Sequence, residues 1–153
     1  MDRDSYCRFI DKICDSFEMV VDRESMYNIC TIKLNDYAFT MYYGGETAPD
    51  KVMVVVDLGP VPTKYRAEIL ERMLETNLFA LGDNTSHFGY TRASQHALLM
   101  RAVPFLPLTV DAYMEVLVSM MQIGSMWRGT YFLSPDQYDK LVTEQTANPA
   151  VTA

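Results

Sequence analysis

The sequence predicts an α+β fold in which one twisted antiparallel sheet packs against helices, in the order α-β-β-β-α-β-β-α. Three long segments repeat apolar residues at intervals of three and four, as amphipathic helices do. Between them lie short runs rich in β-branched and aromatic residues, bounded by turn residues, and such runs are typical of strands. At 153 residues, of which 49% are hydrophobic, the chain is long enough for one domain with one core.

The first helix is expected over residues 4–19. Asp2 or Asp4 stands where a side chain can cap its N-terminus, and charged residues fill the side opposite its apolar stripe. That stripe consists of Tyr6, Phe9, Ile10, Ile13, Cys14 and Phe17.

Three antiparallel strands follow the first helix. Asn35-Asp36 provides a tight turn after the first strand, and a longer loop over residues 44–50 follows the second. The third strand is apolar at every position from Val52 to Val56. A strand with one solvent-exposed face instead alternates apolar and polar residues. We therefore expect the third strand to be central, with both of its faces covered. The three strands are expected over residues 27–34, 37–43 and 51–58.

Two prolines, Pro60 and Pro62, end the third strand because proline cannot donate to a strand ladder. A second helix is expected over residues 63–80, with Ile69, Leu70, Met73, Leu74 and Leu78 on one stripe. A β-hairpin then spans residues 87–103 with a loop of Ala93-Ser94-Gln95. The register that this loop implies pairs Phe88 with Met100 and Tyr90 with Leu98 on one face, so that both faces carry apolar side chains.

The last long helix is expected over residues 110–128, with Thr109 as its N-terminal cap and Gly129 at its end. Residues 1–129 then form the domain, and residues 130–153 form a C-terminal extension. In that extension, the spacing of Ser134 and Gln137 matches a capping box and predicts a short helix over about 135–144 before a flexible tail.

Composition argues against several classes of partner. The net charge is −7 and the cations are scattered singly, which disfavours binding to nucleic acid or to an anionic membrane surface. No apolar run reaches the length of a membrane span, and the N-terminus has no signal-like apolar core, so we expect a cytoplasmic protein. The three cysteines are odd in number and lack a CxxC spacing, which favours reduced, buried side chains.

The sequence contains no recognisable catalytic residues, metal site or cofactor motif. In the predicted hairpin, His87 and His96 lie apart, each near a cation, and no carboxylate or thiolate close in sequence joins them. Gly44-Gly45-Glu46 lacks the GK[ST] of a phosphate-binding loop and is a turn. We therefore expect a binding protein and not an enzyme. Because three or four helices are too few to cover both faces of a five-stranded sheet, we also expect a twofold dimer.

The element order resembles that of the class I chaperones of type III secretion systems, the Tir chaperone (CesT-like) family. The stretch from Ile69 to Trp127 is similar to the most recognisable part of that family. There a "LLEAN"-like helix end leads to a hairpin, a Leu-Pro boundary and a long last helix with Trp near its end. The matching residues here are Met73-Leu74-Glu75-Thr76-Asn77, Leu98 to Pro107, and Trp127.

The resemblance implies an acidic cytoplasmic homodimer without a cofactor or enzymatic activity. Such a chaperone binds the N-terminal segment of one or more secreted effectors, keeps that segment extended and delivers it to the secretion apparatus, including its ATPase. By position, it implies effector contacts at Phe9, Ile13, Phe17, Ile29 and Thr31, and dimer contacts at Leu70, Met73, Phe88 and Tyr90. The alternative is a regulatory or sensory domain of the same fold that binds a folded partner or a small ligand.

Overall fold

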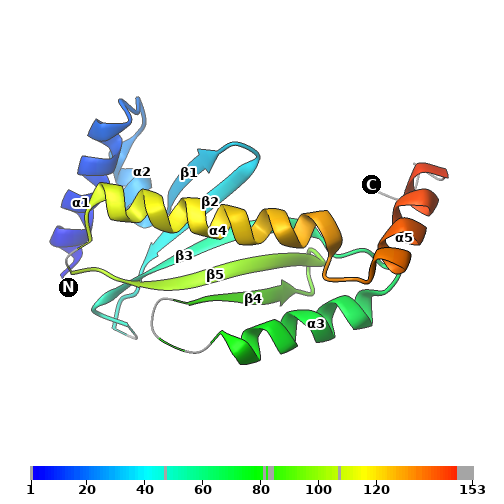
Figure 1. Ribbon diagram of the computed structural model, residues 1–153. Coiled ribbons are helices and arrows are strands. Elements are labelled where there is room, and N and C mark those ends of the chain that lie inside the picture. The colour runs from blue at the N-terminus through cyan, green and yellow to red at the C-terminus, as the bar shows by residue number, and fades with distance from the viewer. Residues whose placement is uncertain (1, 47, 81, 83–84, 107, 148–153) are drawn as a thin grey trace.

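A computed structural model of the chain describes residues 2–46, 48–80, 82, 85–106 and 108–147. These described parts contain five helices and five strands, which are labelled in Figure 1. In chain order they are α1 (Arg3–Ser16), α2 (Arg23–Asn28), β1 (Cys30–Leu34), β2 (Tyr37–Tyr43), β3 (Lys51–Pro60), α3 (Arg66–Phe79), β4 (Ser86–Thr91), β5 (His96–Pro104), α4 (Val110–Thr130) and α5 (Pro135–Ala147). The prediction missed only the short helix α2, and the end of the predicted tail lies outside the described residues.

The strands form one antiparallel sheet in the order β1-β2-β3-β5-β4, which confirms the α+β class and the central position of β3. On β3, Val52, Val54 and Val56 are buried beneath the helices. Met53 and Val55, which point to the other face, are only half-buried. The run of apolar residues therefore marks a central strand, but only one of its faces is fully covered.

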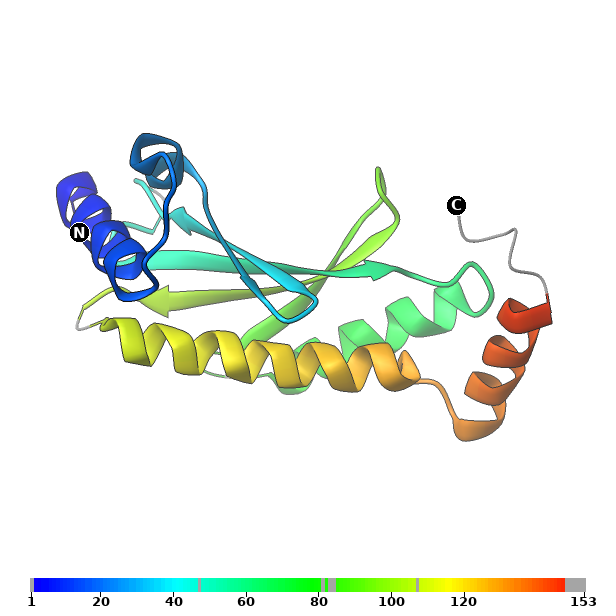
Figure 2. The same cartoon turned by 90° about the horizontal axis from the view of Figure 1, so that it is seen from above.

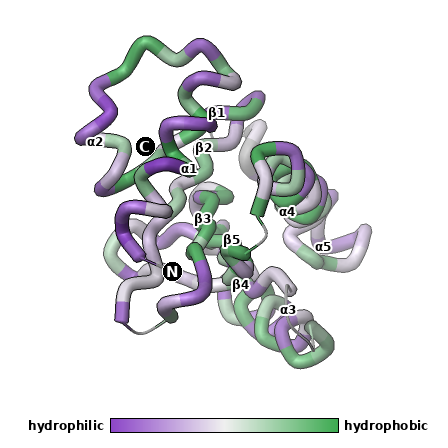
Figure 3. The backbone as a smooth tube through the Cα atoms, turned by 90° about the vertical axis from the view of Figure 1, so that its left-hand side faces the viewer, coloured by the Kyte–Doolittle hydropathy of each residue, from purple (hydrophilic) through white to green (hydrophobic). Residues whose placement is uncertain are grey.

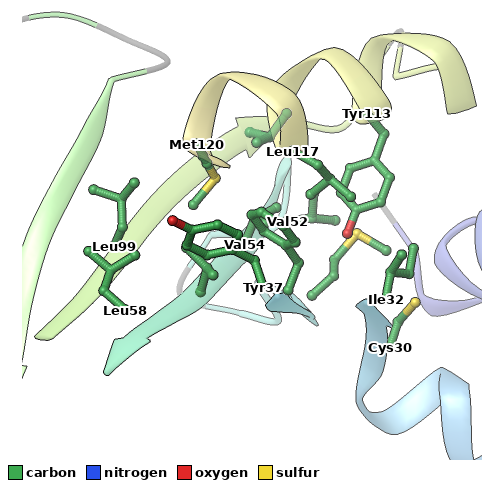
Figure 4. Close-up of a cluster of buried hydrophobic side chains, with 14 of the residues drawn as sticks. Cys30, Ile32, Tyr37, Val52, Val54, Leu58, Leu99, Tyr113, Leu117 and Met120 are labelled. Carbon is green, nitrogen blue, oxygen red and sulfur yellow. The ribbon is translucent and has the colours of Figure 1, made fainter. Parts of the chain in front are cut away.

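Helix α4 lies along the covered face of the sheet, as two perpendicular views show (Figures 1 and 2). Its buried side chains, among them Tyr113, Leu117 and Met120, point down onto the central strands (Figure 4). Helix α1 closes one end of this layer, where the Phe9 ring meets the rings of Phe105 and Tyr113 edge-on. Helices α1 and α5 thus lie at opposite ends of an elongated molecule (Figure 2).

The hairpin of β4 and β5 corrects the predicted register by one residue. Phe88 lies opposite Leu99 and Tyr90 opposite Ala97, so Leu98 and Met100 point to the less covered face. The loop has four residues, from Arg92 to Gln95, and not three, because Thr91 pairs with His96. Gln95 closes the loop with a positive φ of 60°. A shift of one residue exchanges the two faces of a strand, and so the predicted pairs were wrong.

The predicted helix caps are confirmed at three positions. The backbone N–H of Ser5 donates to the Asp2 carboxylate at 2.7 Å, and that of Ala112 donates to the Thr109 hydroxyl at 3.1 Å. Ser134 directly precedes α5, and its backbone N–H donates to the Gln137 side chain at 3.1 Å, which is one of the two hydrogen bonds of a capping box.

The end of α4 differs from the prediction, because the helix continues through Gly129 to Thr130. Tyr131 and Phe132 then turn the chain with positive φ values of 50° and 58°, which is unfavourable for non-glycine residues. Aromatic packing offsets that cost, since the Tyr131 ring meets Trp127 edge-on and the Phe132 ring meets Phe88 edge-on.

Helix α5 packs beside the start of α3 (Figure 1). Leu133 and Leu141 are buried, Gln137 donates a hydrogen bond to Glu68, and Lys64 forms an ion pair with Glu144. The boundary at residue 129 stays a prediction, but these contacts favour α5 as part of the same core.

Candidate functional site

The two histidines do not converge on a site. The His96 Nδ1 lies 2.8 Å from the Asp57 carboxylate on β3, while the His87 Nε2 lies 3.2 Å from the Thr85 hydroxyl. Asp57 is the carboxylate neighbour that sequence proximity could not reveal, because it is 39 positions away from His96 in the chain. Among the described residues, no group of three potential ligands could hold a metal ion.

The cysteines have the environment of structural residues. Cys14 and Cys30 are buried and Cys7 is half-buried, and all three are free thiols. Burial raises the pKa of the Cys30 thiol to about 12, so the thiolate that a nucleophile would need is not populated near neutral pH. The prediction of buried cysteines is therefore confirmed for Cys14 and Cys30.

Helix α2 is held against the polar side of α1 by one cluster of side chains. The Arg23 guanidinium donates to Asp11 at 3.1 Å and pairs with Asp15, and the Tyr27 hydroxyl donates to Asp11 at 2.8 Å. The Tyr27 hydroxyl, and after it the Arg23 guanidinium, hold the pKa of Asp11 below its usual value. These contacts fix the course of the chain from α1 into the edge strand β1.

The predicted effector contacts fall into two groups. Phe9 and Ile13 are buried in the core, so neither offers a surface to a partner, and their prediction as contacts is not supported. The apolar stripe of α1 is buried from Tyr6 to Cys14 and reaches the surface only at Phe17. Phe17 and Ile29 are 43% and 52% exposed, and Thr31 is exposed on β1.

Sequence reasoning missed two apolar residues in the same region. Val20 and Val21, in the link between α1 and α2, are exposed. An apolar residue in a loop carries no periodic pattern that separates core from surface. Phe17, Val20, Val21, Ile29 and Thr31 are named here the α1–β1 surface.

Among the strands that the structure describes, β1 is an edge of the sheet and pairs with β2 alone. Hydrogen-bonded and non-bonded pairs alternate along an antiparallel ladder. Counted from the pair of Leu34 and Tyr37 that closes the two-residue turn, the backbone groups of Thr31 and Lys33 point away from β2. The strand can therefore accept a further strand beside the α1–β1 surface (Figure 3).

The predicted dimer contacts are likewise divided. Met73 and Phe88 are buried in the core, whereas Leu70 and Tyr90 are half-buried. Helix α3 instead exposes three residues that the prediction did not assign to the dimer: Leu74 at 69%, Leu78 at 68% and Phe79 at 81%. Leu70, Leu74 and Leu78 follow one another at intervals of four residues and form a stripe, named here the α3 stripe.

Comparison with known sequences identifies no family model and no curated protein that matches this chain. Comparison of structures does find matches. The fold is similar to that of a chain in the HopA1-SchA chaperone-effector complex, with a TM-score of 0.60 and 18% identity over 85% of this chain and 99% of that chain.

Two further solved structures contain a chain with a similar fold. A chain in the complex of the Yersinia pestis type III secretion chaperone SycH with a fragment of YscM2 matches with a TM-score of 0.59 and 11% identity, over 79% of this chain and 98% of that chain. A chain in the ExoU-SpcU complex from the type III secretion system of Pseudomonas aeruginosa matches with a TM-score of 0.56 and 15% identity, over 76% of this chain and 93% of that chain. The fold is therefore that of structures solved for type III secretion chaperones.

Within the described parts of the chain, no helix is both long and apolar enough to span a membrane.

Proposed function

We propose that this protein is a type III secretion chaperone that binds the N-terminal segment of one or more effectors and keeps that segment extended for export. The observation that carries the proposal is the fold, which is shared with a chain in a chaperone-effector complex and with chains in two complexes whose names include a type III secretion chaperone or a type III secretion system. The open edge of β1 beside the α1–β1 surface gives that fold a place for an extended segment.

Strand addition is the physical basis of the proposed binding. The outward backbone groups of Thr31 and Lys33 supply hydrogen bonds that do not depend on the side chains of the effector. Phe17 and Ile29 supply apolar contacts for alternate side chains of the added strand. A protein that works in this way requires no catalytic group, no metal and no cofactor.

The same proposal includes a homodimer. Leu74 and Leu78 are large apolar side chains on a solvent-facing helix, where they lose the free energy that burial would provide. A twofold axis beside α3 would pack the α3 stripe of one protomer against that of the other. Delivery of the effector to the secretion apparatus, and contact with its ATPase, belong to this proposal as well, as does a cytoplasmic location.

A regulatory or sensory domain of the same fold remains the second candidate. It would bind a folded partner or a small ligand, and the half-buried apolar side chains Met53, Val55 and Met100 on the less covered sheet face would suit a folded partner. The two candidates differ in the state of the bound partner, which is extended in the first and folded in the second.

The experiment that separates them alters the backbone of β1. Thr31→Pro removes the outward N–H at the centre of the open edge, while Thr31→Val keeps the N–H and removes only the hydroxyl. For a partner that adds a strand, we expect Thr31→Pro to weaken binding about tenfold and Thr31→Val to leave it nearly unchanged. Equal affinities for the two variants would contradict strand addition at β1. Binding is measured with the partner that copurifies with the protein.

A further inference from the structure

A groove of about 460 Å³ lies along the flank of α4 that faces away from β1. Val103 and Pro104 of β5 line the groove, together with Ala112 and Val116 of α4. Leu106, which is 76% exposed, stands at its rim. Strand β1 lies on one side of α4 and β4 on the other (Figures 1 and 3), so this groove is separate from the α1–β1 surface.

The groove has one cationic residue, Arg101, in its lining. The Arg101 side chain is half-buried on the same face of β5 as Val103, and its Nε is buried without a hydrogen-bond partner among the described residues. Across the ladder, the Ser86 hydroxyl is also buried and has no partner among them. No carboxylate in the described parts of the chain forms an ion pair with Arg101, although Glu115 lines the groove.

Partial burial of the Arg101 guanidinium has an electrostatic cost. Burial lowers the pKa of Arg101, and no nearby acidic group raises it again. A partly desolvated cation without a counter-charge is unfavourable, and an arriving carboxylate would remove that penalty.

We infer that the groove between α4 and β5 binds an apolar peptide segment that carries one acidic residue, whose carboxylate pairs with the Arg101 guanidinium. The inference rests on charge complementarity and the apolar lining. It does not depend on the proposed function, because the segment need not come from a secreted effector.

The test uses short random peptides displayed on phage and the full-length protein. Peptides are selected on the wild-type protein, and their binding is then compared with binding to the Arg101→Met variant, which keeps an apolar side chain of similar length. Arg92→Met is the matched control, because Arg92 is exposed in the β4–β5 loop, away from the groove. Thermal unfolding of each variant verifies that it is folded.

The expected result is a set of peptides with apolar residues around an Asp or Glu at a fixed position. Replacement of that residue by Asn or Gln should weaken binding to the wild-type protein and to Arg92→Met about tenfold, and leave binding to Arg101→Met unchanged. The inference is overturned if the selection yields no such peptides, or if the acidic residue contributes equally in the presence and absence of Arg101.

Discussion

Asn77 and Phe88 are joined by two hydrogen bonds that tie α3 to the outer edge of the sheet. The Asn77 Nδ2 donates to the Phe88 carbonyl oxygen at 2.8 Å, and the Phe88 backbone N–H donates to the Asn77 Oδ1 at 2.7 Å. The amide of one side chain thus takes the place of a neighbouring strand at β4. These hydrogen bonds give a physical reason for the asparagine at the end of the Met73–Asn77 stretch. That stretch resembles a "LLEAN"-like helix end, and the resemblance alone gives no role to the asparagine.

The first prediction concerns this pair. Asn77→Ala leaves a donor and an acceptor of β4 without partners, and we expect it to lower the free energy of unfolding by about 1–3 kcal/mol. The control is Thr76→Ala, because the Thr76 hydroxyl donates only to the carbonyl of Arg72 within the same helix. Urea unfolding measures both variants. Similar stabilities for the two would show that the contact is dispensable.

The second prediction concerns the close approach of α4 to the sheet at Gly124. A Cβ at this position would lie 2.8 Å from the Leu58 Cδ2 and 3.1 Å from the Tyr37 Cε1. The clash outweighs the better helix propensity of alanine, and we expect Gly124→Ala to destabilise the fold by about 1 kcal/mol. Gly129, in the same helix, has open space around it, so Gly129→Ala should stabilise by about 0.5–1 kcal/mol. In thermal unfolding, the melting temperatures of the two variants should shift in opposite directions from that of the wild-type protein.

The third prediction separates core from binding surface on α1. Ile13→Asp places an unpaired charge in the core and should cost about 3–5 kcal/mol. Phe17→Asp lies at the exposed end of the same stripe and should change stability by only about 0.5 kcal/mol, while it weakens capture of the partner. Circular dichroism and binding to the copurified partner measure the two effects. Full capture by a folded Phe17→Asp variant would exclude Phe17 from the binding surface.

The fourth prediction concerns the α3 stripe. Leu78→Glu should convert a dimer to a monomer, because it places two like charges near the proposed twofold axis. Val142→Glu, on the exposed side of α5, is the control and should leave the dimer intact. Light scattering coupled to gel filtration gives the mass of each. A wild-type protein that is monomeric throughout the accessible concentration range would refute the homodimer.

Much of the fold could be predicted because its long elements carry strong periodic signals. The helices at both ends, the caps at Asp2 and Thr109, and the central position of β3 all follow from local patterns. Helix α2 was missed because six residues are too few to show a helical period. The β4–β5 register was wrong because a loop of three residues and one of four fit the same turn signals equally well.

The surface residues were harder to predict for a different reason. Ile69 and Leu70 are adjacent in sequence, and so are Met73 and Leu74, yet in each pair the first residue is buried and the second is not. A wide apolar stripe shows that a helix packs but not how far around it the contact extends. The sequence around Arg101 does not indicate a binding residue, because the lack of a counter-charge becomes apparent only in the folded structure.

Native mass spectrometry of the protein isolated from its own host cells tests the proposed chaperone function most directly. We expect a complex of two copies of this chain with one larger polypeptide, and proteolysis should show that the bound segment of that polypeptide is unfolded when it is free. A monomer without a partner, or a dimer that carries only a small ligand, would contradict the proposal and favour a regulatory domain.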